Sequence, residues 1–138
     1  MEECEKVKIN RYWCLGALAR IKKDPNICLE ELNNKFSEDQ ELGKDWCLDS
    51  LGFENVTGIS ICQKMGKNSY KTSCVTSEAE KQGDISICSQ YIQREDEETT
   101  FRDIEVCKYQ VARKTRDKTI CDSIQIEYTK QLCESEFE

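Results

Sequence analysis

Ten cysteines recur along this chain at regular intervals, and histidine is absent. Four pairs are separated by 14 or 15 positions: Cys14 and Cys28, Cys47 and Cys62, Cys74 and Cys88, Cys107 and Cys121. The intervals between successive pairs alternate between 19 and 12 positions, and a final interval of 12 leads to Cys133. Self-similarity at a fixed period is typical of repeat architectures. Cysteine at every step predicts a repeat that is stapled by disulfides.

The apolar core available to this chain is small for its length. The 138 residues are 38% hydrophobic, but ten of these hydrophobic residues are cysteines, and 34% of the chain is charged. A chain with so much charge and so little apolar surface would ordinarily tend toward disorder. Disulfides restrict the unfolded state and contribute about 2–4 kcal/mol each for loops of this size. We therefore expect five cross-links to contribute more than any single packing cluster.

Each repeat unit is expected to contain a helix that starts just before the second cysteine of a pair. Isoleucine always directly precedes that cysteine. A helix-capping type stands ten positions after the first cysteine: Asp24, Thr57, Asp84 or Asp117. Such side chains accept hydrogen bonds from the free N–H groups at a helix start. Apolar residues three or four positions beyond the cysteine are expected to continue the same helical face: Leu32, Met65, Ile92 and Ile124.

A second helix is expected around the first cysteine of each pair. Apolar or small residues follow that cysteine at most of the positions one, four and five residues later, which places the cysteine in the buried stripe of a helix. The small residue at the fifth position allows a neighbouring helix to approach closely: Ala19, Gly52, Ala79 or Ala112. With one proline, six glycines and little strand-like alternation, the chain is predicted to be all-α.

A longer period lies above the first one. Cys14 and Cys74 are 60 positions apart, and so are Cys28 and Cys88. The sequence therefore predicts a short α-solenoid of about five disulfide-clipped αα-hairpins, built from a duplicated two-hairpin cassette of about 60 residues. We expect one helical-repeat domain over residues 1–138, with cassettes at approximately 1–61 and 62–121 and a terminal hairpin at 121–138.

Two pairings of the cysteines are compatible with the spacing. Pairing across the constant 14-residue spacing leaves Cys4 and Cys133 without local partners. Pairing across the variable intervals uses every cysteine locally and clips the two helices of each hairpin together. We therefore predict the second set: Cys4–Cys14, Cys28–Cys47, Cys62–Cys74, Cys88–Cys107 and Cys121–Cys133.

Charge and cysteine usage restrict the compartment and the partners. The net charge is −7 and the basic residues form no stripe, which disfavours binding to nucleic acid and to anionic lipid. The sequence contains no run of about 18 apolar residues, so no membrane span is predicted. The acidic opening of the sequence is unlike a signal peptide, whereas dense cysteines indicate an oxidising compartment. We expect a secreted or cell-surface protein whose targeting segment is not in this sequence; the alternative is the cytoplasm of a hyperthermophile.

Catalytic and cofactor motifs are not apparent. Structural zinc sites use cysteines or histidines two to four residues apart, whereas no two cysteines here are closer than ten positions. No nucleophile–base pair or phosphate-binding loop can be identified, so we predict no enzyme activity, cofactor or small-molecule ligand. Two long linkers contain clustered carboxylates, in Arg94-Glu95-Asp96-Glu97-Glu98 and at Glu38, Asp39 and Glu41. A solvated surface is the favoured interpretation of these clusters, and weak calcium binding is the alternative.

Three residues are candidates for modification or partner binding. Asn55 opens an Asn-Val-Thr glycosylation triplet in a predicted loop between helices. Trp13 and Trp46 each directly precede a cysteine. They are either exposed aromatic anchors for a partner or, as we favour, side chains that pack over the bridge and the next helix.

The runs Asp24-Pro25-Asn26-Ile27-Cys28, Lys44-Asp45-Trp46-Cys47-Leu48 and Asp84-Ile85-Ser86-Ile87-Cys88 resemble cysteine-containing helical repeats of uncharacterised archaeal and bacterial proteins, often surface or exported. The resemblance covers nearly the whole chain, although Thr57-Gly58 replaces Asp-Pro in the second hairpin. It implies a fold and a location but no activity. We expect a scaffold that binds another protein or has a structural role. The alternatives are a self-assembling subunit of a fibre or surface layer, because no polar cap is obvious, and a secreted inhibitor or enzyme.

Overall fold

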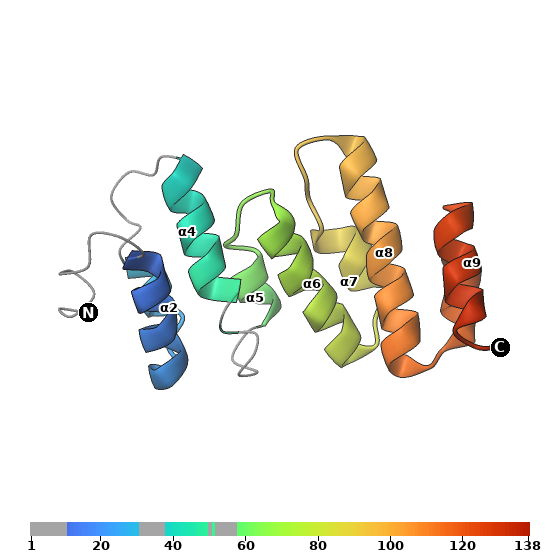
Figure 1. The fold of residues 1–138 in the computed structure, drawn as a ribbon, viewed down its shortest axis with the longest axis horizontal. Helices are drawn as coiled ribbons and strands as arrows, with labels where there is room; N and C mark the ends of the chain where they lie inside the picture. Colours follow the sequence, from blue (N-terminus) through green and yellow to red (C-terminus); the bar gives the residue numbers. More distant parts are fainter. Residues whose placement is uncertain (1–10, 31–37, 50, 52–57) are drawn as a thin grey trace. The chain divides into compact units, whose positions relative to one another are not determined.

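The computed structural model describes the backbone of residues 11–30, 38–49, 51 and 58–138, and the side chains of 14–28, 44–49, 51 and 58–138. These parts of the chain are mostly helical and contain no strand, which confirms the all-α prediction. The chain divides into two compact units, Met1–Gly66 and Lys67–Glu138 (Figure 1).

The first unit contains helices α2 (Arg11–Lys22), α3 (Asn26–Glu30), α4 (Glu38–Asp49) and α5 (Ile59–Cys62). Helix α2 packs against α3 and α4, and α3 also packs against α4. The predicted stripes lie inside this unit wherever side chains are described, with Leu15, Ala19, Leu48 and Leu51 almost fully buried. Gly52 and Leu32 lie outside the described residues.

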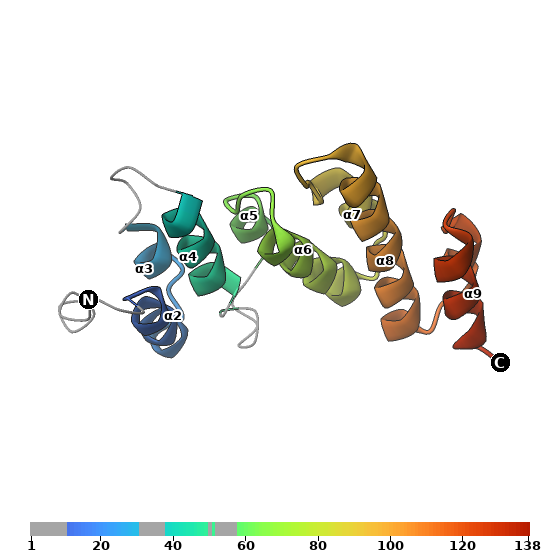
Figure 2. The same ribbon diagram turned by 45° about the horizontal axis from the view of Figure 1, so that its top comes forward.

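The second unit contains α6 (Ser69–Gln82), α7 (Ser86–Tyr91), α8 (Glu97–Thr115), the 3₁₀ helix η2 (Lys118–Ser123) and α9 (Glu127–Ser135). Helix α8 packs against all four of the other helices and is therefore the centre of this unit. Figure 2 shows the short helix α7 beside α8. The core of the unit includes Val75, Ala79, Val111 and Ala112, which are fully buried as predicted.

The long helices of the second unit run in the same direction, and the short helices return the chain between them (Figure 1). Hydrogen bonds between α8 and the α9 region establish this direction. The Gln125 N–H, just before α9, donates to Glu105 Oε2 at 2.7 Å, and the Tyr109 hydroxyl donates to Glu136 Oε1 at 2.7 Å. Since later residues of α8 contact later residues of the α9 region, the two helices are parallel. Residues at equivalent positions of these helices therefore face the same side of the unit.

The turn from a long helix to a short one is built in the same way three times. The helix ends at a residue with left-handed backbone, and the next residue is an aspartate whose N–H donates to a buried alanine carbonyl of that helix. The left-handed residues are Lys23, Gly83 and Arg116, with φ of 53°, 63° and 60°. The N–H to carbonyl distances are 3.0 Å for Asp24 to Ala19, 3.1 Å for Asp84 to Ala79 and 3.1 Å for Asp117 to Ala112.

The same aspartates cap the short helices. In each case the side-chain Oδ1 accepts the N–H two residues ahead: Asn26 at 3.0 Å, Ser86 at 2.9 Å and Thr119 at 3.0 Å. The predicted caps at Asp24, Asp84 and Asp117 are therefore confirmed. Thr57, the fourth predicted cap, lies outside the described residues.

The short helices end earlier than the sequence predicts. Ile92 and Ile124 are buried, at 2% exposure each, but they follow the last turns of α7 and η2 in extended backbone, with ψ of 126° at both. Met65 is buried in the same way beyond the end of α5. The prediction that these residues continue a helical face was wrong. An extended segment covers more distance per residue than a helix, so it carries the chain back to the start of the next long helix while each side chain still enters the core.

The two acidic linkers are also shorter than predicted. Helix α4 already begins at Glu38, so Glu38, Asp39 and Glu41 lie in a helix, and Glu97 and Glu98 form the first turn of α8. Carboxylates are favourable in a first turn because the free N–H groups there carry partial positive charge. The acidic clusters therefore mark helix starts.

In α4 and α8 a buried carboxylate fastens the long helix to a segment that follows it in the chain. Asp45 and Glu105 stand two positions before a helix cysteine and are 0% and 1% exposed. Glu105 accepts the Gln125 N–H described above, and Asp45 Oδ2 accepts the Gly66 N–H at 2.9 Å. Lys108 Nζ also donates to Glu105 Oε1 at 3.1 Å. A buried carboxylate with such donors contributes more than a neutral hydrogen bond would.

Replacing Glu105 by alanine should lower the free energy of unfolding by about 2–3 kcal/mol, because the Gln125 N–H loses its acceptor and the Lys108 ammonium keeps only the Ser123 carbonyl, at 3.4 Å. Glu105→Gln keeps an acceptor for the N–H and should lose less. Urea unfolding of both variants with the disulfides intact measures the difference. Parent-like stability of Glu105→Ala, or a loss in Glu105→Gln as large as in the alanine variant, would contradict the assigned role.

Candidate functional site

Three disulfides each join a short helix to the long helix that follows it. The bridges Cys28–Cys47, Cys88–Cys107 and Cys121–Cys133 are present, with Cα–Cα distances of 5.7, 5.9 and 5.6 Å. All six cysteines are fully buried. These three bridges belong to the predicted set of local pairs, and the distances lie within the usual range for disulfides.

The other described cysteines are also oxidised. Cys14, Cys62 and Cys74 are disulfide-bonded, and no described cysteine is free. Cys4 lies outside the described residues, so the pairs Cys4–Cys14 and Cys62–Cys74 stay predictions. Because the thiolate is the reactive and metal-binding form of cysteine, a sulfur held in a disulfide is not available for either role.

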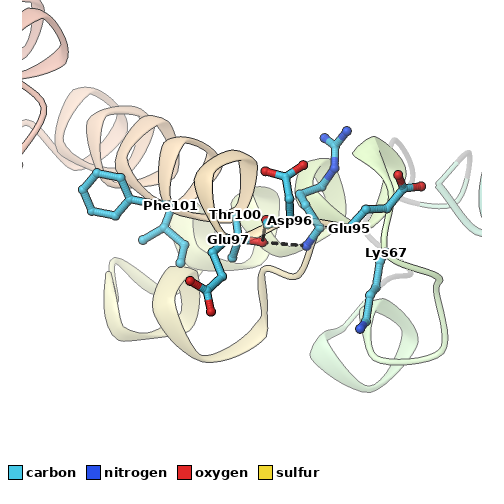
Figure 3. A pocket seen from close by; sticks show the side chains of 8 residues that line it. Lys67, Glu95, Asp96, Glu97, Thr100 and Phe101 are labelled. Carbon is cyan, nitrogen blue, oxygen red and sulfur yellow. Dashed lines mark hydrogen bonds between the residues drawn. The ribbon is translucent and has the colours of Figure 1, made fainter.

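A shallow hollow of about 390 Å³ lies where the chain enters α8. Residues of the acidic segment 94–98 form part of its lining, which includes Arg94, Asp96, Glu97, Thr100 and Phe101 (Figure 3). The Arg94 N–H donates to Thr100 Oγ1 at 2.9 Å, and the Arg94 guanidinium pairs with Asp103 at 3.0 Å. These contacts hold the corner of the chain in place.

The carboxylates around this hollow do not converge. In Figure 3 the side chains of Glu95, Asp96 and Glu97 point in different directions. Within the part of the chain that the structure describes, no three histidine, cysteine or carboxylate groups are placed to hold a metal ion. The side chains of Glu38, Asp39 and Glu41 are not among those described.

Asp96 is occupied as the cap of α8. Its Oδ1 accepts the Thr99 N–H at 2.7 Å and its Oδ2 accepts the Thr99 hydroxyl at 3.0 Å. Both hydrogen bonds favour the ionised form and hold the pKa of this carboxyl below its usual range. The same cause, hydrogen bonds from Ser86, lowers the pKa of Asp84 at the start of α7.

An apolar surface lies across α8 and α9. We call it the α8–α9 face and define it by Arg102 and Val106 of α8 with Tyr128 and Leu132 of α9. Val106, Leu132 and Tyr128 are 42%, 39% and 71% exposed, and the Arg102 side chain is 62% exposed. Arg102 and Tyr128 both stand five positions before a helix cysteine, and Val106 and Leu132 both stand one position before it. Because α8 and α9 are parallel, these equivalent positions lie on one side of the unit.

The two tryptophans considered as possible partner anchors, Trp13 and Trp46, share this register. Trp46 directly precedes Cys47, as Val106 precedes Cys107, and its side chain is half-buried. Part of the Trp46 side chain is therefore packed and part is exposed. This burial does not decide between an exposed anchor and a side chain that packs over the bridge. The side chain of Trp13 and the glycosylation triplet at Asn55 lie outside the described residues.

Sequence reasoning did not identify Val106, Tyr128 or Leu132 as surface residues. The signal was present in the cysteine alignment, because the position before the helix cysteine is apolar in four of its occurrences: Trp13, Trp46, Val106 and Leu132. In the described parts of the chain, no helix is long and apolar enough to cross a membrane.

Replacing Asp96 by alanine should lower the unfolding temperature at neutral pH, because α8 loses its cap. Since the folded-state pKa is lowered, this stabilisation is present above the unfolded pKa and is lost as pH falls through the folded pKa. The difference between parent and variant should therefore shrink below about pH 4. Thermal unfolding across pH measures it, with Asp96→Asn as a control that keeps the capping oxygen; a difference that does not change with pH would contradict the ionised cap.

Comparisons with known proteins identify no relative: no protein-family model, no curated protein and no solved structure matches this chain. The geometry described above is therefore the basis on which a function is inferred.

Proposed function

We propose that this protein is an extracellular or cell-surface scaffold, a disulfide-stapled helical repeat that binds another protein or has a structural role. The buried bridges between short and long helices are the observation that carries this proposal. Buried disulfides form and persist in oxidising compartments. They also let a chain with a net charge of −7 and a small core keep a fixed surface.

The repeat that we propose is a short α-solenoid of clipped hairpins. Two recurrences support it. The aspartate turn follows α2, α6 and α8, and the buried carboxylate precedes the cysteine of both α4 and α8. Repeats of this kind typically present an extended surface made of equivalent positions on successive units. Such a surface suits binding, because its shape is set by the scaffold and its side chains are free to vary.

Binding is favoured over catalysis by what the second unit leaves exposed. The α8–α9 face combines apolar, aromatic and arginine side chains, which are the types enriched where proteins contact one another. The carboxylates near the hollow at residues 94–104 are engaged in a helix cap or diverge from one another. We therefore propose a protein partner and no reaction.

The oxidised protein should contain five bridges, and its stability should depend on them. Non-reducing peptide mapping should recover the three bridges described above together with Cys4–Cys14 and Cys62–Cys74. Reduction should lower the free energy of unfolding by about 2–4 kcal/mol for each bridge, and it should unfold the chain because the core is small. Free thiols in protein from its native source, or a reduced form as stable as the oxidised one, would reject the stapled scaffold.

The alternative is a self-assembling subunit of a fibre or surface layer. The α8–α9 face is an apolar surface that copies of the chain could share, which is the observation in its favour. On α9, however, the exposed amide of Gln131 stands where α8 has the buried Glu105, so a further hairpin would meet a polar group there. We expect sedimentation to give a monomer at all concentrations. Association that grows with concentration would favour the alternative.

A further inference from the structure

Four cations stand within six positions where the chain leaves α8. Arg113 and Lys114 belong to the last turn of the helix, Arg116 is the left-handed residue that ends it, and Lys118 begins η2. We call this cluster the basic turn. We propose that the basic turn is a docking site of the scaffold, and that the part of the partner bound there is an acidic peptide segment. This inference rests on the binding function proposed above.

The cations of the basic turn are exposed, and their charges are not matched by carboxylates of the unit. In the described part of the chain, none of the four forms an ion pair. Cations earlier in the same unit do pair with carboxylates: Lys81 with Glu78, Arg94 with Asp103, Arg102 with Glu98 and Lys108 with Glu105. Like charges close together on a helix repel one another. An anion from outside the chain would relieve this repulsion.

The carboxylates that border the basic turn are engaged elsewhere or form no ion pair with it. Asp117 caps η2 through the N–H two residues ahead, at 3.0 Å, and Glu136 accepts the Tyr109 hydroxyl at 2.7 Å. Burial raises the pKa of Glu80 on α6, and two cations of the basic turn partly oppose that rise from a distance. The exposed Glu138 forms no ion pair within the described residues. The four positive charges therefore stay available to a partner.

The backbone holds a cation where glycine would be less strained. The residue before each turn aspartate is left-handed, and after α6 it is Gly83, with φ of 63°. After α8 it is Arg116, with φ of 60°, where an L-residue has a steric cost that glycine avoids. Strained positions of this kind cluster at functional sites. The helix macrodipole favours Arg113 and Lys114 in a last turn, but it does not account for a cation in this strained position.

The first unit repeats the pattern independently. A cation stands four positions and one position before the turn aspartate at the ends of both α2 and α8: Arg20 and Lys23, and Arg113 and Arg116. Lys23 is left-handed as well, with φ of 53°. After α6 the same two positions hold Glu80 and Gly83, so the turn itself does not require cations there. The cations therefore have a use other than forming the turn.

The charges of the basic turn select its occupant. A guanidinium presents paired N–H groups that match a carboxylate, and the turn contains two. The Arg116 guanidinium lies over the Phe137 ring, 5.9 Å from its centre, which restricts its motion before a partner binds. A long polyanion would also meet the net charge of −7 of the whole chain, whereas a short acidic segment need contact only the turn. An acidic segment of a protein partner is therefore the occupant that fits.

The test titrates a short, fluorescently labelled polyglutamate peptide with the oxidised full chain at low salt and follows its anisotropy. Arg113→Ala combined with Arg116→Gly should weaken binding about tenfold, because two contacting charges are lost. This variant should stay folded, since alanine favours a helix and glycine holds the equivalent turn after α6. The matched control is Lys67→Ala combined with Arg102→Ala. It removes two exposed cations of the same unit outside the basic turn, and it should change binding less than about twofold.

Salt and a second anion complete the test. The affinity for polyglutamate should fall as sodium chloride is added, because the contacts are exposed charges. No binding of polyglutamate, or equal losses in the two double variants, would overturn the assignment of the basic turn while leaving a binding function through another surface intact. Inorganic polyphosphate that binds more tightly than polyglutamate of equal charge, with the same loss in the Arg113 and Arg116 variant, would assign the turn to phosphate groups and would also overturn the proposal.

Discussion

The disulfide between a short return helix and the next long helix is the constraint on which each unit depends. In the second unit, the fully buried Cys88–Cys107 bridge joins α7 to α8, and the Cα atoms of these two cysteines are 5.9 Å apart. Helices that approach so closely need small neighbours, and Ala79 and Ala112 are both fully buried at the ends of α6 and α8. The same alanines receive the aspartate N–H that turns the chain into the next short helix. The disulfide, the buried alanines and the aspartate turns therefore occur together in this unit.

The direction of the buried cysteine side chain also sets the directions of the neighbouring side chains on the helix. Successive helical residues are rotated by about 100°. Cys107 and Glu105, two positions apart, therefore point toward different neighbours: Cys107 bonds to Cys88 of α7 and Glu105 accepts the Gln125 N–H before α9, whereas Val106 between them is 42% exposed. In the first unit the order is the same: Asp45 and Cys47 are fully buried, and Trp46 between them is only half-buried. In both helices the residues on either side of the more exposed position are buried against neighbouring segments.

The sequence predicts the parts of this structure that depend on local pattern. Cysteine spacing predicts the helical class and local bridges, and aspartate ten positions after a cysteine predicts the caps at Asp84 and Asp117. The burial of Ile92 is also predicted, but its extended backbone is not, because an apolar residue three or four positions along fits a helical face and a buried extended segment equally well. The left-handed turn at Arg116 is hidden for a similar reason: arginine does not signal positive φ as glycine does at Gly83. The α8–α9 face requires the knowledge that two helices are parallel, which no single segment contains.

The polar residues of α9 bear on the proposed choice between a binding scaffold and a self-assembling subunit. A following hairpin would pack where α8 presents Glu105, and α9 has Gln131 at that position. Stacking there would bury an amide without the partners that Glu105 has in α8, and unpaired buried polar groups oppose association. Tyr128 and Leu132 lie on a different side of α9, so covering them leaves this polar group in water.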